Sequence, residues 1–252
     1  MANSKFQPNC GIPIDFEGFL GARWPKDVFY FSDDFIGNNS TASAELGTWL
    51  STLVAQAATG VSVVDGTSGS QDETGGILAI TTEATAGDGE NLQVNGAAFQ
   101  IKAGYPLYFE TRINLKDVSN SKAFIGLCIP DTAILASAVD DIGFRIASDI
   151  WYFLTEHAST EKTTDIGITE ADDDWIRLAF FYDGADTVIA SVDANDKGEF
   201  TEICSRKLSV ATDYVPDLIM MTPSIEFTSD ATASAEIMWV DYVFCIQQRY
   251  HE

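Results

Sequence analysis

The chain has 252 residues, of which 46% are apolar and 21% are charged, a balance typical of a soluble globular protein. Its 38 acidic residues outnumber its 14 lysines and arginines, so the formal net charge is −24. Because such a surface repels phosphate groups and anionic lipids, we expect neither nucleic acid nor a membrane surface as a partner. A cationic partner surface would suit it.

The opening decapeptide, MANSKFQPNC, has no basic region followed by an apolar core, so we expect no signal peptide. No window approaches about 18 consecutive apolar residues, the length that a membrane-spanning helix needs. We therefore expect a protein that is made in a cytosol and stays there unless something exports it.

Residues 1–30 are predicted to form an irregular arm, and residues 31–252 a single folded domain. Prolines and glycines interrupt every periodic pattern in the arm, yet aromatic residues are scattered through it: Phe6, Phe16, Phe19, Trp24, Phe29 and Tyr30. A segment with so many aromatics is too apolar to be a plain disordered tail. It either packs on its own domain or docks on a neighbour.

Strands dominate from Phe31 onward. The segment LYFETRINL at 107–115 alternates apolar and polar residues, which is the period of a half-buried strand. The segment 236–246 is apolar on both faces apart from Glu236 and Asp241, as expected in the middle of a sandwich. Further strands are predicted at 49–56, 61–64, 76–82, 121–129, 142–147, 150–155, 176–184, 187–192 and 200–205.

Short helices are predicted only at 40–46 and 132–138, and Gly, Asn and Asp turns separate the strands. The fold class is therefore all-β, a two-sheet antiparallel sandwich of the jelly-roll type.

The segment DANDKG at 193–198 could open a calcium loop or form a turn between two strands. Asp193, Asn195 and Gly198 fit positions 1, 3 and 6 of an EF-hand loop, but Lys197 occupies position 5 and Cys204 position 12. Because Asn, Asp and Gly between two apolar runs are typical of hairpins, we predict a turn.

Catalytic patterns are missing. Glycosidases on such sandwiches carry Glu-x-Asp-x-Glu on one strand, which sends all three carboxylates to one face. The nearest candidates are residues 15–17 in the arm and the acidic run 172–174 before Trp175, and both lie outside predicted strands. The run 172–174 is interpreted as a solvated turn, with a surface calcium site as the alternative.

No nucleophile elbow or phosphate loop is present, and His157 has no assigned partner. We therefore expect that the chain is not an enzyme.

Aromatic residues and cysteines fit a core better than a site. Alternation places Trp151 and Phe153 on one face and Tyr152 on the other, so packing accounts for at least two of them, and a sugar-binding face is the alternative. Three of the four cysteines lie in apolar strand-like runs and are predicted to be buried, reduced thiols: Cys128, Cys204 and Cys245, with Cys10 in the arm. The two histidines share no zinc-ligand spacing with them, so we expect no metal and no cofactor.

Several segments in order resemble a known family. They are DDF at 33–35, a strand that begins at Trp49, GGILAIT from Gly75, YFETRINL at 108–115, FIGL at 124–127, DIGF at 141–144, WIRLAFFY at 175–182, VDA at 192–194, WVDYVF at 239–244 and QQR at 247–249. Together, from Ser32 to Arg249, they resemble the concanavalin A-like (LamG-like) jelly-roll virion proteins of tailed bacteriophages, particularly cyanophages and other marine phages. Their order carries the resemblance, because each motif alone is mostly a strand pattern.

The resemblance implies a sandwich without catalytic carboxylates that acts as a capsid decoration or cement protein, frequently a trimer, on the surface of the virion after synthesis in the host cytoplasm. Its partners would be the major capsid protein and copies of itself. Large aromatic anchors dominate interfaces, so the expected contact residues are Phe6, Phe16, Phe19 and Trp24, with Arg249 and Tyr250 as a second contact. The alternatives are a glycan-binding module of a tail fibre and a glycoside hydrolase with an unrecognised site.

Overall fold

The structure is a computed structural model, and it describes residues 28–35, 48–54, 60–65, 76–168, 172–230 and 235–248. The expected contact residues of the arm (Phe6, Phe16, Phe19 and Trp24) and of the C-terminus (Arg249 and Tyr250) lie outside these ranges, as do Cys10, residues 15–17 and the helix predicted at 40–46. Among the described residues, no helix has the length and apolar character needed to cross a membrane.

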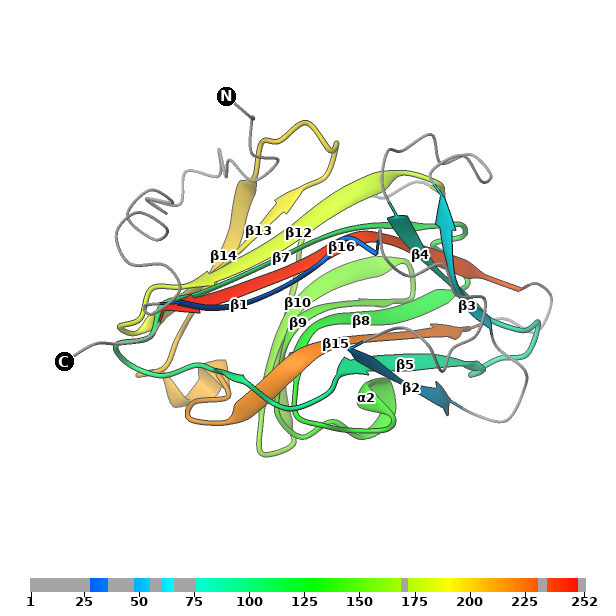
Figure 1. The fold of residues 1–252 in the computed structure, drawn as a ribbon. Helices are drawn as coiled ribbons and strands as arrows, with labels where there is room; N and C mark the ends of the chain where they lie inside the picture. Colours follow the sequence, from blue (N-terminus) through cyan, green and yellow to red (C-terminus); the bar gives the residue numbers. More distant parts are fainter. Residues whose placement is uncertain are drawn as a thin grey trace, which may run out of the picture.

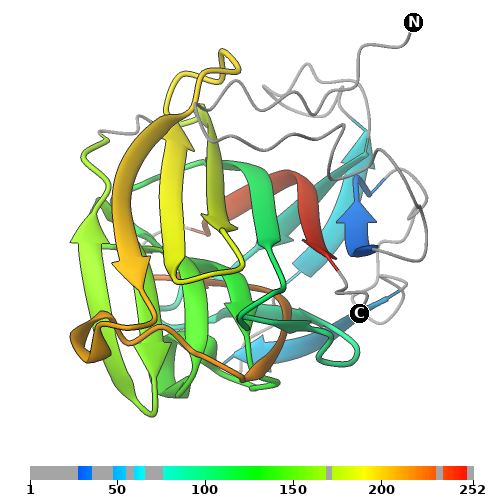
Figure 2. The ribbon, with the colours of Figure 1, turned by 90° about the vertical axis from the view of Figure 1, so that its left-hand side faces the viewer.

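The described residues form two antiparallel sheets that stack on each other (Figures 1 and 2). The order in the first sheet is β14 (Thr201–Lys207), β13 (Thr187–Asp193), β12 (Trp175–Tyr182), β7 (Leu107–Leu115), β16 (Ile237–Gln248), β4 (Gly76–Thr81) and β3 (Gly60–Asp65), and β1 (Val28–Asp33) also pairs with β16. The order in the second is β11 (Thr160–Asp165), β10 (Ile150–His157), β9 (Asp141–Ala147), β8 (Ser121–Cys128), β15 (Met220–Ser229), β5 (Gly89–Val94) and β2 (Trp49–Val54), and β6 (Phe99–Gln100) pairs with β15. The all-β, two-sheet prediction is confirmed.

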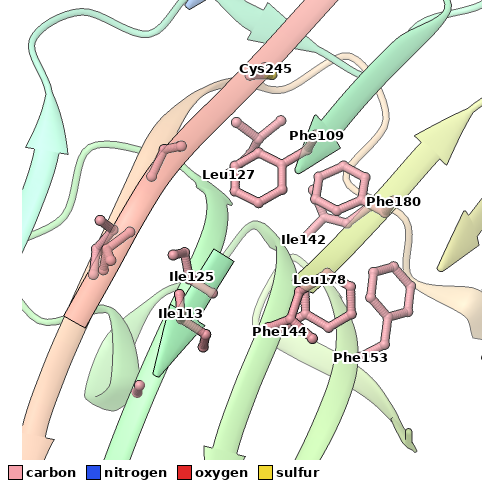
Figure 3. Close-up of a cluster of buried hydrophobic side chains, with 14 of the residues drawn as sticks. Phe109, Ile113, Ile125, Leu127, Ile142, Phe144, Phe153, Leu178, Phe180 and Cys245 are labelled. Carbon is pink, nitrogen blue, oxygen red and sulfur yellow. The ribbon is translucent and has the colours of Figure 1, made fainter. Parts of the chain in front are cut away.

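The core lies between the two sheets. The face of β7 that the alternation pattern marks as apolar points into it, and Phe109 stacks on Phe180 of β12 with ring centroids 5.1 Å apart. From the opposite sheet, Phe144 and Phe153 approach the Phe180 ring at 6.5 and 6.1 Å (Figure 3). These rings are fully buried, so the inner faces meet mainly through aromatic and branched aliphatic side chains.

Each predicted strand corresponds to a strand of the structure, with described ends that differ by at most two residues, and the helix predicted at 132–138 contains the single turn α2 (Ile134–Ser137). Residues 237–246 of the predicted segment lie in β16, which has β7 on one side and β4 and β1 on the other, as its apolar faces predict. Cys128 and Cys245 are buried free thiols as predicted, whereas Cys204 is only half-buried.

Five strands have no counterpart in the sequence prediction: β1, β5, β6, β11 and β15. The longest is β15, a central strand that contains Pro223, a residue that argues against a central strand because it lacks a backbone N–H. On one side of β15, pairing with β6 ends at Met221 and pairing with β5 begins at Ser224. Pro223 falls between these two ladders, where its missing N–H costs no ladder hydrogen bond on that side.

The start of the domain also differs from the expectation. Residues 28–30, assigned to the arm by the sequence, form the first half of β1 and pair with residues 246–248 of β16. Residues 28–30 therefore belong to the sandwich.

The turn predicted at 193–198 is confirmed, since β13 and β14 pair on either side of it. The Asp193 carboxylate accepts the backbone N–H groups of Lys197 at 3.1 Å and Gly198 at 2.6 Å, and Asp196 and Gly198 adopt positive φ angles of 50° and 82°. Both carboxylate oxygens of Asp193 thus hold the turn together.

Two glycines of the motifs at 124–127 and 141–144 pair directly across β8 and β9. A Cβ atom on Gly126 would lie 2.3 Å from the Ile142 carbonyl oxygen, and one on Gly143 would lie 2.5 Å from that of Ile125. We expect Gly126→Ala and Gly143→Ala each to lower the free energy of unfolding by about 1–3 kcal/mol, as overpacking does. Urea denaturation measures this, with Thr163→Ala on the exposed face of β11 as the control; an unchanged midpoint for both glycine variants would contradict the close approach.

Candidate functional site

Two tight hairpins place three carboxylates in one row across the second sheet. The turn residues 148–149 have φ angles of 53° and 67°, and 158–159 have 51° and 62°, the positive values of the two-residue turns that fix hairpin register. The resulting registers set Asp141 opposite Glu156, and Glu156 opposite Glu161. Directly opposed residues have Cβ atoms about 4.5–5.5 Å apart, so neighbouring carboxylates in this row repel each other.

The row lines a cavity of about 160 Å³ that we call the carboxylate pocket. Helix α2 lies against the outer face of the second sheet and forms one wall (Figure 1). The lining residues are Phe124, Ile134, Leu135, Ala136, Ser137, Ala138, Asp141, Arg145, Leu154, Glu156 and Glu161. Arg145 is the one cation among them, and its guanidinium contacts both carboxylate oxygens of Glu161, at 2.8 and 3.0 Å. Two carboxylates of the row are left without a cation from the lining.

Asp141 is the most deeply placed of the three, with 3% of its surface exposed. Its Oδ1 is buried and has no hydrogen-bond partner among the described residues. Burial raises the pKa of Asp141 well above its usual range, and the nearby Glu156 raises it further, against a smaller opposing effect of Arg145. Burial and the neighbouring Glu161 also raise the pKa of Glu156. The structure therefore disfavours having both carboxylates charged at once.

Polar side chains of β5 and β15 hold α2 over the pocket. The Glu226 carboxylate accepts the backbone N–H of Ile134 at the start of α2, and burial raises the pKa of Glu226 to about 7. Gln93 accepts the backbone N–H of Asp131 at 2.8 Å and donates to the Ile129 carbonyl at 3.0 Å. These bonds fix the segment before α2, so the wall of the pocket is anchored to the sheet.

A second polar cluster lies on the outer face of the first sheet. Arg112 of β7 bridges Asp196 at 2.6 Å and Asp241 at 3.1 Å, and its guanidinium lies 4.2 Å from the centre of the Trp175 ring. Asp196 also accepts a bond from Arg177 at 2.7 Å. The charges are paired, so this cluster fastens the 193–198 turn to three strands, which is a structural role.

Glu110, on the same face of β7, is buried with both carboxylate oxygens engaged. The hydroxyls of Tyr108 and Tyr242 each donate to it at 2.5 Å. Burial raises the pKa of Glu110, and these two donors work in the opposite direction. Glu110 is therefore a satisfied core carboxyl group.

The residues singled out in the sequence lie mostly away from the pocket. Trp151 and Phe153 are buried in the core as alternation predicts, which leaves only Tyr152 of that cluster half-exposed for a ligand. The run 172–174 is confirmed as a turn, in which Asp172 accepts the backbone N–H of Val118 at 2.9 Å. Within the described ranges, no group of three or more His, Cys, Asp and Glu residues is placed to hold a metal ion.

His157 has a partner that the sequence analysis did not assign. Its Nδ1 lies 2.6 Å from Oδ1 of Asp140, across the end of the β9–β10 hairpin. The search for carboxylates along one strand missed the pocket, because its acids come from three different strands. Each two-residue turn fixes the register of its whole hairpin. Recognising the turns at 148–149 and 158–159 would therefore have placed Asp141 opposite Glu156, and Glu156 opposite Glu161.

Solved structures share this fold. A protein of unknown function from Shewanella oneidensis has a TM-score of 0.59 at 12% identity, with 98% of this chain and 100% of that chain covered. An endo-1,3-β-glucanase from Streptomyces sioyaensis has 0.58 at 13% identity, covering 90% and 98%, and a glycosyl hydrolase family 16 protein from Mycobacterium smegmatis has 0.55 at 15%, covering 85% and 98%. The fold is the concanavalin A-like jelly roll. No protein-family model and no curated protein matches the sequence.

These structures correct one expectation. The sequence predicts that the chain is not an enzyme, because the expected patterns of catalytic carboxylates, nucleophiles and phosphate loops are missing from it. That expectation is wrong, since several solved structures with this jelly roll are glycoside hydrolases, among them an endo-1,3-β-glucanase. At 13–15% identity the likeness concerns the fold, which is one that carries catalysis in those proteins.

The protonation state of Asp141 can be tested through the pH dependence of the free energy of unfolding. Because its folded-state pKa is raised, the carboxyl group favours the fold while protonated, and this contribution is lost as the pH rises through that pKa. Asp141→Asn keeps the group neutral, so we expect it to raise the free energy of unfolding by about 1–3 kcal/mol at pH 8, with the difference vanishing towards about pH 4. Urea denaturation across this range measures it.

Asp140→Asn is the matched control, since Asp140 is one residue away and accepts hydrogen bonds from His157 and the backbone of Ala158. It should leave stability at pH 8 unchanged or lower. A loss of stability in Asp141→Asn at pH 8 would show that the carboxylate has a partner in solution.

For the polar cluster around Arg112 we expect the opposite effect, a loss of stability when a charged residue is replaced. Arg112→Ala removes the guanidinium that bridges Asp196 and Asp241, and breaking a buried ion pair is costly, so the variant should lower the free energy of unfolding by about 3–5 kcal/mol. Lys122→Ala, which removes an exposed pair with Asp230, should cost at most about 1 kcal/mol. Similar losses for the two variants in thermal or urea unfolding would argue against a structural role of the cluster.

Proposed function

We propose that the chain is a structural protein of a tailed-phage virion, a decoration subunit that contacts the head shell and copies of itself. The ordered motifs support this: FIGL falls on β8, DIGF on β9, WIRLAFFY on β12 and WVDYVF on β16, in a fold of the kind that the resemblance implies. The net charge of −24 favours a cationic surface as the partner and keeps assembled particles apart.

One observation carries the proposal. Val28 of β1 pairs with Gln248 of β16, so the sequences before and after the described sandwich leave it at the same point. These are the two segments that the sequence predicts as contacts, residues 1–27 with their aromatic anchors and residues 249–252 with Arg249 and Tyr250. β16 lies in the middle of the first sheet and is buried on both faces. A mechanical force applied to either segment is therefore transmitted to the central strand of the sandwich.

The test is binding of the purified protein to intact phage shells, measured by co-sedimentation and by imaging. We expect deletion of residues 1–27 to weaken binding at least tenfold, because large aromatic anchors dominate interface energies. The deletion must stop before Val28, since removing residues 28–30 would also remove half of β1. An unchanged circular-dichroism spectrum and melting temperature establish that the sandwich is intact.

Leu50→Ser and Leu53→Ser, two exposed positions of edge strand β2, serve as controls that alter the sandwich surface and leave the ends untouched. Equal decoration by the truncated and full chains would remove the role of the arm. Failure of the full chain to bind any shell, together with its absence from purified virions, would end the proposal.

A further inference from the structure

The carboxylate pocket holds a charge arrangement that the fold alone does not explain. Asp141, Glu156 and Glu161 repel one another across adjacent strands, and both terminal nitrogens of Arg145 bind Glu161, while its Nε is buried without a hydrogen-bond partner among the described residues. Among the described residues, no cation lies within ion-pair distance of Asp141 or Glu156, and Oδ1 of the buried Asp141 accepts no hydrogen bond. A buried acceptor without a partner costs free energy, so such a conflict points to a ligand that resolves it.

The chemistry of the lining indicates what kind of cation would fit. The described residues include no group of three or more ligands placed for a metal ion, which argues against an inorganic divalent cation. An ammonium group needs only a few acceptors at hydrogen-bond distance and supplies three donors. The half-buried side chain of Leu135 in α2 belongs to the lining and packs over the buried Phe124 and Leu154, so one side of the site is apolar and suits a methylene stem.

The size of the pocket also favours an ammonium group on an alkyl chain as the ligand. Its volume of about 160 Å³ is below the roughly 300–1,000 Å³ of pockets that enclose drug-sized ligands, and it suits a single slender chain. Apolar walls also lower the local dielectric constant, which strengthens the attraction between a carboxylate and a cation.

We propose that the carboxylate pocket binds an alkylammonium group, with its nitrogen between Asp141 and Glu156 and its stem along Leu135 of α2. The lysine side chain of a protein and a free aliphatic diamine share this chemistry. The site is independent of the proposed role in the virion, because it lies on the outer face of the second sheet, whereas the two end segments leave from the first sheet.

The test is isothermal titration calorimetry at pH 8 and low ionic strength, with four probes: 1,5-diaminopentane, Nα-acetyl-lysine methylamide, neutral pentane-1,5-diol and calcium chloride. We expect one or both amines to bind, the diol and calcium to give no heat, and added salt to weaken the binding. Binding of the lysine derivative identifies a protein lysine as the source, and binding of the diamine alone identifies a free polyamine.

Asp141→Asn and Glu156→Gln should each weaken amine binding at least tenfold, while Asp140→Asn, outside the pocket lining, should bind as the unaltered protein does. Asp141→Asn is expected to fold more stably, so its loss of binding would not come from unfolding. Amine binding that persists in both pocket variants would overturn the proposal, as would tighter binding of calcium than of the amines. Release of reducing ends from a β-1,3-glucan that is abolished by Glu156→Gln would also overturn it, and would assign the pocket to hydrolysis instead.

Discussion

The structure depends on the contact between the inner faces of its two sheets, where Phe109 and Phe180 of one sheet meet Phe144 and Phe153 of the other. Such packing constrains register, because a slip of one residue would turn every inward side chain of a strand to the outside. In β9 and β10, keeping Phe144 and Phe153 inside forces Asp141 and Glu156 to the opposite face. The position of the carboxylate pocket is therefore a consequence of how the core is packed.

The sequence predicts those parts of the fold in which one strand carries its own signal. Alternation identifies β7, β10 and β12, and continuous apolar character identifies β16, because each pattern is local to the strand. It fails for β15, where Pro223 together with Ser and Thr masks a central strand, and for β11, a polar edge strand with little apolar character. Both owe their place to pairing with neighbours that lie elsewhere in the sequence.

The pocket was harder to predict because its chemistry is spread over three strands and a helical turn. The turns at 148–149 and 158–159 carry neither Gly nor an Asn-Gly pair, so nothing local marks them as two-residue hairpins, yet they set the row of carboxylates. Motif searches along a single strand cannot detect such a row. In the second polar cluster the reverse holds, since the sequence marks the 193–198 turn correctly but gives no sign that Asp196 reaches Arg112 and Arg177.

The two polar clusters differ in whether their charged side chains are paired with one another. Around Arg112 each described carboxylate has a guanidinium partner, and Arg112 joins two of these carboxylates, so the cluster is explained by the stability it provides. Around Asp141 the acids outnumber the cation, and the buried Oδ1 of Asp141 has no hydrogen-bond partner among the described residues. Ion pairing within the fold does not account for this arrangement, whereas a cation bound between the acids would be attracted by each of them.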